Sequence, residues 1–328
     1  MSPERERGAA LLTVLLLVAV IAVLAAGALE KLRLSTRLAG NAAGTEQARS
    51  YAMAAEVLAT KKVDDLLGQA PDRVTLAGGW SGRPFGLPLP GGGVAVARVR
   101  DGGNCFNLNA LVTVVPNTPG QYASRGEARA QFARLMRLLD VPAQVAEQVA
   151  AGAADWIDSD QDQQASGAED ARYLSQTIGY RTSGTLMADP SELRAVSGVT
   201  SDLYATLRPW ICALPLAEMP TININTLSPE QAPLLAMLAP DTMTVAMARQ
   251  ALLARPEQGY ADAGRFWAQP ALASVQPGDV VRQTITTSTW FAMTIDVSLG
   301  DSAVQENALI DARRLPAQLV SRQWGEAS

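Results

Sequence analysis

The chain has 328 residues, with 27 lysines and arginines against 32 aspartates and glutamates, so its formal net charge is −5. It contains no histidine, which excludes Ser-His hydrolase triads and histidine-ligated metal sites. A chain of this length has room for a membrane anchor and roughly two folded units.

The first element in chain order is an apolar segment over residues 9–29, which is made almost entirely of Ala, Leu, Val and Ile and carries no charge. A helix of this length rises about 30 Å, enough to cross the hydrocarbon core of a bilayer. The apolar stretch is longer than that of a secretory signal, and no small-residue cleavage site follows it. On the residues alone, an ordinary N-terminal anchor helix is the alternative. Lysines and arginines lie on both sides of the segment, so they do not settle its orientation in the membrane.

An amphipathic stripe continues this segment beyond the bilayer. No proline occurs between Pro3 and Pro71, and small or apolar residues recur every three or four positions from Ala48 to Leu66. We therefore predict one helix over residues 9–67. Its first half lies in lipid, and its second half packs on a folded domain.

Along the rest of the chain the predicted secondary structure changes from strand to helix and back to strand. Candidate strands lie at residues 74–77 and 94–99, joined by a Gly/Pro-rich turn segment, and four more follow near the C-terminus, at 280–288, 290–299, 307–315 and 318–324. Between them the pattern is helical, with candidate helices at 130–139, 144–156, 190–196, 201–210, 229–238 and 244–253. Asp189 and Ser228 provide N-caps for two of these helices.

This order predicts an α+β fold: a long N-terminal transmembrane helix packed on a small antiparallel sheet, with a large inserted α-helical domain. Residues 68–112 form the first part of the sheet domain, and residues 113–215 form the insertion. Residues 216–328 supply a second helical hairpin segment and the C-terminal strands.

Three features resemble a known family. The short charged stretch 1–8, which ends at the Gly8-Ala9 junction, resembles the leader of type IV pilins and type II secretion pseudopilins. Residues 101–111, Asp-Gly-Gly-Asn-Cys-Phe-Asn-Leu-Asn-Ala-Leu, closely resemble a segment of the K-type minor pseudopilin, and the resemblance runs over essentially the full length. Thr13 stands where most pilins carry glutamate, an absence that is typical of the K-type subunit.

The resemblance implies a non-enzymatic subunit at the tip of the type II secretion pseudopilus. Prepilin peptidase would cut between Gly8 and Ala9 and methylate Ala9, leaving a single-pass inner-membrane protein with its bulk in the periplasm. The subunit would help to initiate assembly and export of folded proteins across the outer membrane. Its partners would be other minor pseudopilins, the major pseudopilin and the inner-membrane assembly platform, with no nucleic acid. A minor pilin of a type IV pilus is the alternative.

The only two cysteines, Cys105 and Cys212, both follow the membrane segment. In an oxidising periplasm they would form a disulfide, which closes a long loop and stabilises the fold by roughly 4–5 kcal/mol on the chain-entropy model. Two buried free thiols are the alternative.

The densest acidic cluster spans residues 155–170. Six carboxylates within one Gly/Ser-containing segment repel one another unless a hard cation such as Ca²⁺, which takes 6–8 oxygen ligands, offsets their charge. The spacing is not that of an EF-hand, and the residues alone favour a solvated acidic loop. The segment resembles the calcium-binding Asp-Trp-Ile-Asp and Gly-Ala-Glu-Asp stretches of the pseudopilin family, however. That resemblance implies a Ca²⁺ site with the ligands Asp155, Asp158, Asp160, Glu169 and Asp170.

Two further functions were weighed against this interpretation. A hydrolytic acid–base pair of Asp158 and Glu169 is disfavoured, because no carboxylate of the crowded loop stands out as isolated in an apolar pocket. Residues 222–226 and the hairpin that follows resemble a helix-hairpin-helix DNA-binding module. The hairpin carries Pro240, which has no N–H group, and Asp241, which repels phosphate. We therefore predict that these hairpins are structural.

Overall fold

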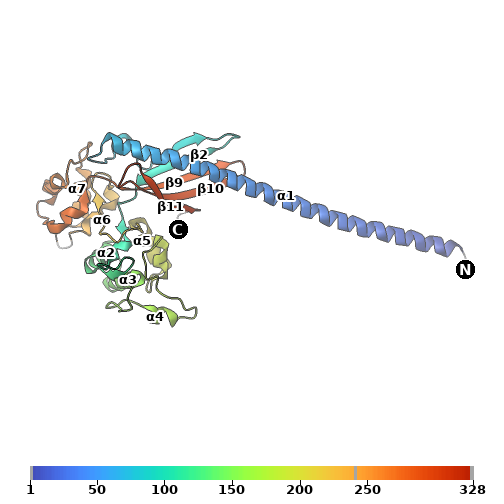
Figure 1. The fold of residues 1–328 in the computed structure, drawn as a ribbon, viewed down its shortest axis with the longest axis horizontal. Coiled ribbons are helices and arrows are strands. Elements are labelled where there is room, and N and C mark those ends of the chain that lie inside the picture. The colour runs from blue at the N-terminus through green and yellow to red at the C-terminus, as the bar shows by residue number, and fades with distance from the viewer. Residues whose placement is uncertain (1–2, 240–241, 326–328) are drawn as a thin grey trace.

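The computed structural model describes residues 3–239 and 242–325, with side chains from residue 11 onward. Its longest element is α1 (Pro3–Gln69), which projects far beyond the folded body (Figure 1). The predicted long helix is confirmed, and it begins six residues earlier than expected, within the leader. The side chains between residues 11 and 42 are exposed, whereas Ala48, Ala52, Ala59 and Val63 are buried.

The buried half of α1 packs on an antiparallel sheet of five strands in the order β1-β2-β9-β10-β11. The strands are β1 (Phe85–Pro88), β2 (Val94–Asp101), β9 (Trp290–Leu299), β10 (Ser302–Asp311) and β11 (Gln318–Trp324). Ala52 and Ala59 of the helix, with Ala95 and Ala97 of β2, are fully buried, and such small side chains let helix and sheet approach closely. The α+β architecture is thus confirmed.

Two of the predicted strands are wrong. Residues 74–77 lead instead into a short 3-10 helix, η1 (Ala77–Gly79), because Gly78 and Gly79 adopt positive φ angles that end an extended run. Residues 280–288 contain only the two-residue strand β8 (Thr284–Ile285), preceded by the 3-10 helix η7 (Gly278–Gln283). Val280 and Val281 pack against the helical core rather than into the sheet. The strand predicted at 307–315 is β10, which begins and ends earlier.

The helical region consists of two units, each closed by a pair of parallel two-residue strands. In the first unit β3 (Phe106–Asn107) pairs with β6 (Ile211–Cys212), and in the second β7 (Ile222–Asn223) pairs with β8. The first unit also contains η2 (Leu108–Leu111), β4 (Val112–Val114), β5 (Tyr122–Ser124), α2 (Gly126–Leu138), α3 (Ala143–Ile157), α4 (Asp170–Leu174), η3 (Pro190–Ala195), α5 (Ser201–Leu207) and η4 (Arg208–Trp210). The second contains η5 (Pro229–Gln231), α6 (Ala232–Ala236), α7 (Val245–Leu253), α8 (Ala263–Trp267), η6 (Pro270–Leu272) and η7.

One apolar core is common to both units. It includes Phe106 and Phe132, whose rings stack at 4.7 Å between centroids, and it extends to Phe266 of α8. The helical region therefore reaches from about residue 104 to residue 285 and is wider than the predicted insertion at 113–215. Both predicted N-caps, Asp189 and Ser228, are present, and each forms a capping box with the side chain three residues later.

Candidate functional site

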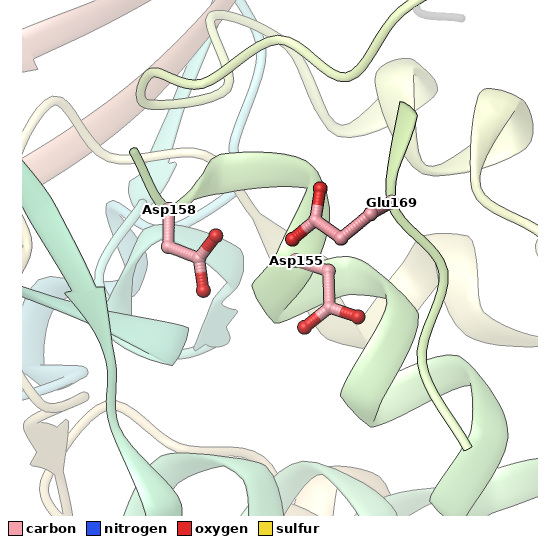
Figure 2. Close-up of side chains that lie close together, drawn as sticks. All are labelled: Asp155, Asp158 and Glu169. Carbon is pink, nitrogen blue, oxygen red and sulfur yellow. The ribbon is translucent and has the colours of Figure 1, made fainter. Parts of the chain in front are cut away.

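Three acidic side chains converge where α3 ends and α4 begins. Asp155 lies in the last turn of α3, Asp158 follows as its C-cap, and Glu169 is the residue just before α4. Figure 2 shows the three side chains lying close together, where the end of one helix meets the segment that carries Glu169. We call Asp155, Asp158 and Glu169 the carboxylate cluster. One oxygen from each lies within 4.8 Å of the others, and all three residues are buried.

Backbone N–H groups hold only one member of the cluster. The carboxylate of Asp155 accepts hydrogen bonds from the backbone N–H of Ala168 at 2.8 Å and of Gln164 at 3.2 Å. The four oxygens of Asp158 and Glu169 have no hydrogen-bond partner among the described residues, although these residues are only 1% and 5% exposed. A buried carboxylate without a partner costs free energy, so these oxygens are suited to a ligand that supplies positive charge.

The electrostatics agree with the geometry. Burial, together with the negative charge of the neighbouring acids, raises the pKa of Asp155 to about 6, that of Asp158 to about 7 and that of Glu169 to about 8. At neutral pH the cluster must therefore hold a proton or a cation.

The structure brings three of the five predicted ligands together. Asp160 is exposed, and its carboxylate accepts the N–H of Asp162 at 2.8 Å, although its charge still raises the pKa of the cluster acids. Asp170 points elsewhere. Its carboxylate accepts the backbone N–H of Thr182 at 2.9 Å and pairs with Arg181 at 2.7 Å, which lowers the pKa of Asp170.

Two parts of the site were not identified from the sequence. The first is Gly167, where an added Cβ would collide with the carboxylate of Asp155, so only glycine lets the loop wrap this closely. The second is an aromatic wall of Trp156, Tyr173 and Tyr180, whose ring centroids lie 5.1–6.0 Å apart. The aromatic partners of Trp156 lie too far along the chain for local pattern to reveal them.

The donor set fits a hard divalent cation. The three side chains of the cluster offer carboxylate oxygens, and the two members without hydrogen bonds can present both oxygens to an ion. Ca²⁺ accepts several oxygens at irregular angles, whereas Mg²⁺ demands a tight octahedron.

The remaining predicted site residues lie away from the cluster. Cys105 and Cys212 form a disulfide with a Cα–Cα distance of 5.8 Å, beside the β3–β6 pair that closes the first helical unit. Gly8 and Ala9 lie in the first turns of α1, and their side chains are outside the described part of the chain.

The stretch that resembles a helix-hairpin-helix module has a structural role. Asn223 and Asn225 are buried, and their amides bond to the backbone of Val74 and Tyr260 rather than facing solvent. Pro240 and Asp241 of the hairpin lie outside the described residues.

Comparison with known proteins finds similarity over nearly the whole chain. Two family models described as type II secretion system protein K match residues 104–216 and 222–288, which correspond to the two helical units. The type II secretion system protein K of Pectobacterium carotovorum subsp. carotovorum is 33% identical, over 98% of this chain and 97% of its own length. That of Aeromonas hydrophila is 35% identical, over 96% and 98%.

A solved structure shows the same architecture. A chain in the crystal structure of the GspK-GspI-GspJ complex from the type II secretion system of enterotoxigenic Escherichia coli superposes with a TM-score of 0.74 at 34% identity. The match covers 86% of this chain and 96% of that one.

Proposed function

The chain belongs to the type II secretion system protein K family and is a minor pseudopilin, and from this premise we propose that it occupies the tip of the periplasmic pseudopilus. The observation that carries the proposal is the division of α1 into an exposed apolar half and a half buried against the sheet. Such a helix can leave the bilayer and enter a filament core without unfolding the domain that it carries. The type IV pilus alternative is disfavoured, because the relatives are type II secretion proteins.

The proposed topology follows from the same helix. The apolar part of α1 is long enough to cross a bilayer and none of it is buried in the folded body, which supports a single-pass anchor. The disulfide lies beyond this anchor, and such bonds persist in oxidising compartments. We infer that the body lies in the periplasm and that prepilin peptidase cuts between Gly8 and Ala9.

The partners that we propose are the I- and J-type minor pseudopilins, because the similar solved chain belongs to a GspK-GspI-GspJ complex. The test is to express the full chain with these two subunits from the same organism and to purify through a tag on one of them. We expect all three to co-purify in detergent, and deletion of this chain to abolish secretion of a folded substrate. Unchanged secretion in the deletion strain would contradict the function.

The leader can be tested in the same cells. Intact-mass analysis of the membrane-extracted protein is expected to show a chain beginning at N-methylated Ala9. A mature protein that retains residues 1–8 in the presence of active prepilin peptidase would contradict the pilin-type processing.

We also propose that the carboxylate cluster binds Ca²⁺ through Asp155, Asp158 and Glu169. The support is the set of unpartnered buried oxygens on Asp158 and Glu169 together with the raised pKa values of all three acids. The ion would offset their repulsion and join the end of α3 to the start of α4. The role that we propose for the ion is structural.

A further inference from the structure

An apolar groove of about 440 Å³ lies beside the C-terminal turns of α1. The helix forms one wall, and the segment from Gly78 to Phe85, which runs from η1 into β1, forms the other. The lining includes the buried side chains of Val63 in α1 and Val99 in β2. The volume lies within the range of binding pockets, roughly 300–1,000 Å³. The groove is on the sheet domain, away from the carboxylate cluster, so its shape and charge do not depend on a bound ion.

Hydrogen bonds fix the outer wall of the groove. The N–H of Gly82 donates to the carbonyl oxygen of Val99 at 2.8 Å, and Ser81 forms a β-bridge with the same residue. The indole N–H of Trp80 donates to the carbonyl oxygen of Thr75 at 2.7 Å, which holds the ring against the groove. A ligand that binds here therefore does not have to order the wall first, and its binding loses less free energy.

Two cations and no acid are found among the described residues that line the groove. Lys62 of α1 places its Nζ atom 4.9 Å from the ring centroid of Phe85, and the exposed side chain of Arg83 lies on the other wall. In the part of the chain that the structure describes, neither side chain forms an ion pair or a hydrogen bond. The ring contact holds Lys62 at the rim without neutralising its charge. The groove thus offers an apolar surface beside two uncompensated positive charges.

The acids nearest in sequence to Lys62 are engaged elsewhere. Lys61, the preceding residue, pairs with Asp65 at 2.7 Å. Asp64 accepts a hydrogen bond from the backbone N–H of Ala317 at 2.7 Å. The chain therefore neutralises Lys61 and leaves Lys62 without an acid, which makes Lys61 a matched control for its neighbour.

The position of the groove along α1 favours a protein partner over a lipid surface. The helix continues without interruption from Leu29, where the apolar segment ends, to Lys62. At about 1.5 Å per residue this is a rise of about 50 Å. The headgroup region of a bilayer is much thinner than that, so lipids that surround the anchor do not reach the groove.

We propose that this groove binds an extended segment of a partner protein in which apolar side chains lie between acidic residues. The apolar side chains pack on Leu66 and Val99, which removes apolar surface of both proteins from water. The flanking carboxylates pair with Lys62 and Arg83 on the two walls. No acid of the lining repels such a segment, whereas a basic segment would meet two like charges.

The test uses the full chain in phosphatidylcholine nanodiscs, because detergent would compete for an apolar groove. The probe is a capped Glu-Leu-Phe-Glu peptide, and calorimetry measures its affinity. We expect the double variant Lys62→Gln/Arg83→Gln to weaken binding about fivefold, as loss of two exposed ion pairs predicts, and Lys61→Gln to leave it nearly unchanged. A capped Gln-Leu-Phe-Gln peptide is expected to bind the wild type about fivefold more weakly as well. Equal affinities of the two peptides, or equal effects of the double variant and Lys61→Gln, would overturn the proposal.

A second measurement uses the wild-type chain, so that no variant has to fold. The chain has three lysines, Lys31, Lys61 and Lys62, and peptide mass spectrometry reports how fast a reagent acetylates each of them. We expect the acidic peptide to slow acetylation of Lys62 severalfold and to leave the rates at Lys31 and Lys61 unchanged. No protection of Lys62, or equal protection by a capped Glu-Gly-Gly-Glu peptide, would overturn the proposal. Stronger protection by octanoate than by the peptide would assign the groove to a lipid-like anion instead of a protein and would also overturn it.

Discussion

Asn109 and Asn225 make the same pair of contacts in the two helical units. The amide of Asn109 donates to the carbonyl oxygen of Met187 at 2.9 Å and accepts its N–H at 2.8 Å. Asn225 does the same with Tyr260, at 2.9 and 2.7 Å. Each asparagine thus satisfies both backbone groups of one distant residue. With the parallel strand pair that closes each unit, this correspondence shows that the two units are built alike.

The first prediction concerns these amides. Asn109→Ala is expected to destabilise the first unit, because two buried backbone groups lose their partners at about 1–3 kcal/mol each. Hydrogen exchange measured by mass spectrometry is expected to speed up at the Met187 amide and to stay slow at Tyr260. Asn225→Ala reverses the pattern, and exposed Asn41→Ala serves as the control. Unchanged exchange at both sites would show that the asparagine hydrogen bonds do not protect these backbone amides.

The second prediction concerns the proposed ion. The full chain in detergent is expected to melt higher in millimolar Ca²⁺ than in EDTA, because a ligand at a hundredfold excess over its Kd stabilises by about 2.7 kcal/mol. Asp158→Asn is expected to remove most of this difference, since Asp158 lies in the cluster with both oxygens unpartnered. Asp160→Asn, on the exposed side of the loop, is expected to keep most of it. Identical melting in Ca²⁺ and EDTA would refute the site.

The third prediction tests the wrap of the loop around Asp155. Gly167→Ala is expected to abolish the Ca²⁺-dependent rise in melting temperature, because the new methyl group collides with the Asp155 carboxylate. Gly68→Ala is the matched control: no atom lies within 4 Å of a Cβ there, and alanine favours a helix. Retention of the full calcium effect by Gly167→Ala would argue against the close wrap.

The fourth prediction is a pH dependence without metal. Folding raises the pKa of Asp155, Asp158 and Glu169 to about 6, 7 and 8, so the folded chain binds more protons than the unfolded one. In EDTA the free energy of unfolding is therefore expected to be highest near about pH 4 and to fall up to about pH 8. Excess Ca²⁺ is expected to remove most of this loss, because the ion replaces the protons. The measurement is thermal melting across this range in both buffers.

The fifth prediction concerns a second buried acid, Glu306 of β10. Burial and the adjoining Glu56 of α1 raise the pKa of Glu306 to about 7, and Arg322 pairs with Glu56 at 2.6 Å. The stability that protonated Glu306 provides is lost as the pH rises through about 7. Glu306→Gln is therefore expected to reduce the loss of melting temperature between about pH 6 and pH 8. The measurement is made in excess Ca²⁺, so that protonation of the carboxylate cluster does not add to the pH dependence. Glu147→Gln, at an exposed position, is the control.

The sequence by itself determined the features that depend on local pattern. The run without proline and its three-to-four-residue periodicity predict α1, and β-like composition between turn residues predicts β2, β9 and β11, because both signals are properties of neighbouring residues. The disulfide was predictable because Cys105 and Cys212 have no competitor.

Only the tertiary structure decided which acids converge. Glu169 and Asp170 are adjacent in the sequence, yet Glu169 turns into the cluster while Asp170 pairs with Arg181 and Thr182. The same holds for residues 280–288, where a β-like composition yields the end of a 3-10 helix and a strand of only two residues, because Val280 and Val281 pack on the helical core. In both cases packing against distant parts of the chain sets the direction of each side chain, and the local sequence does not contain that information.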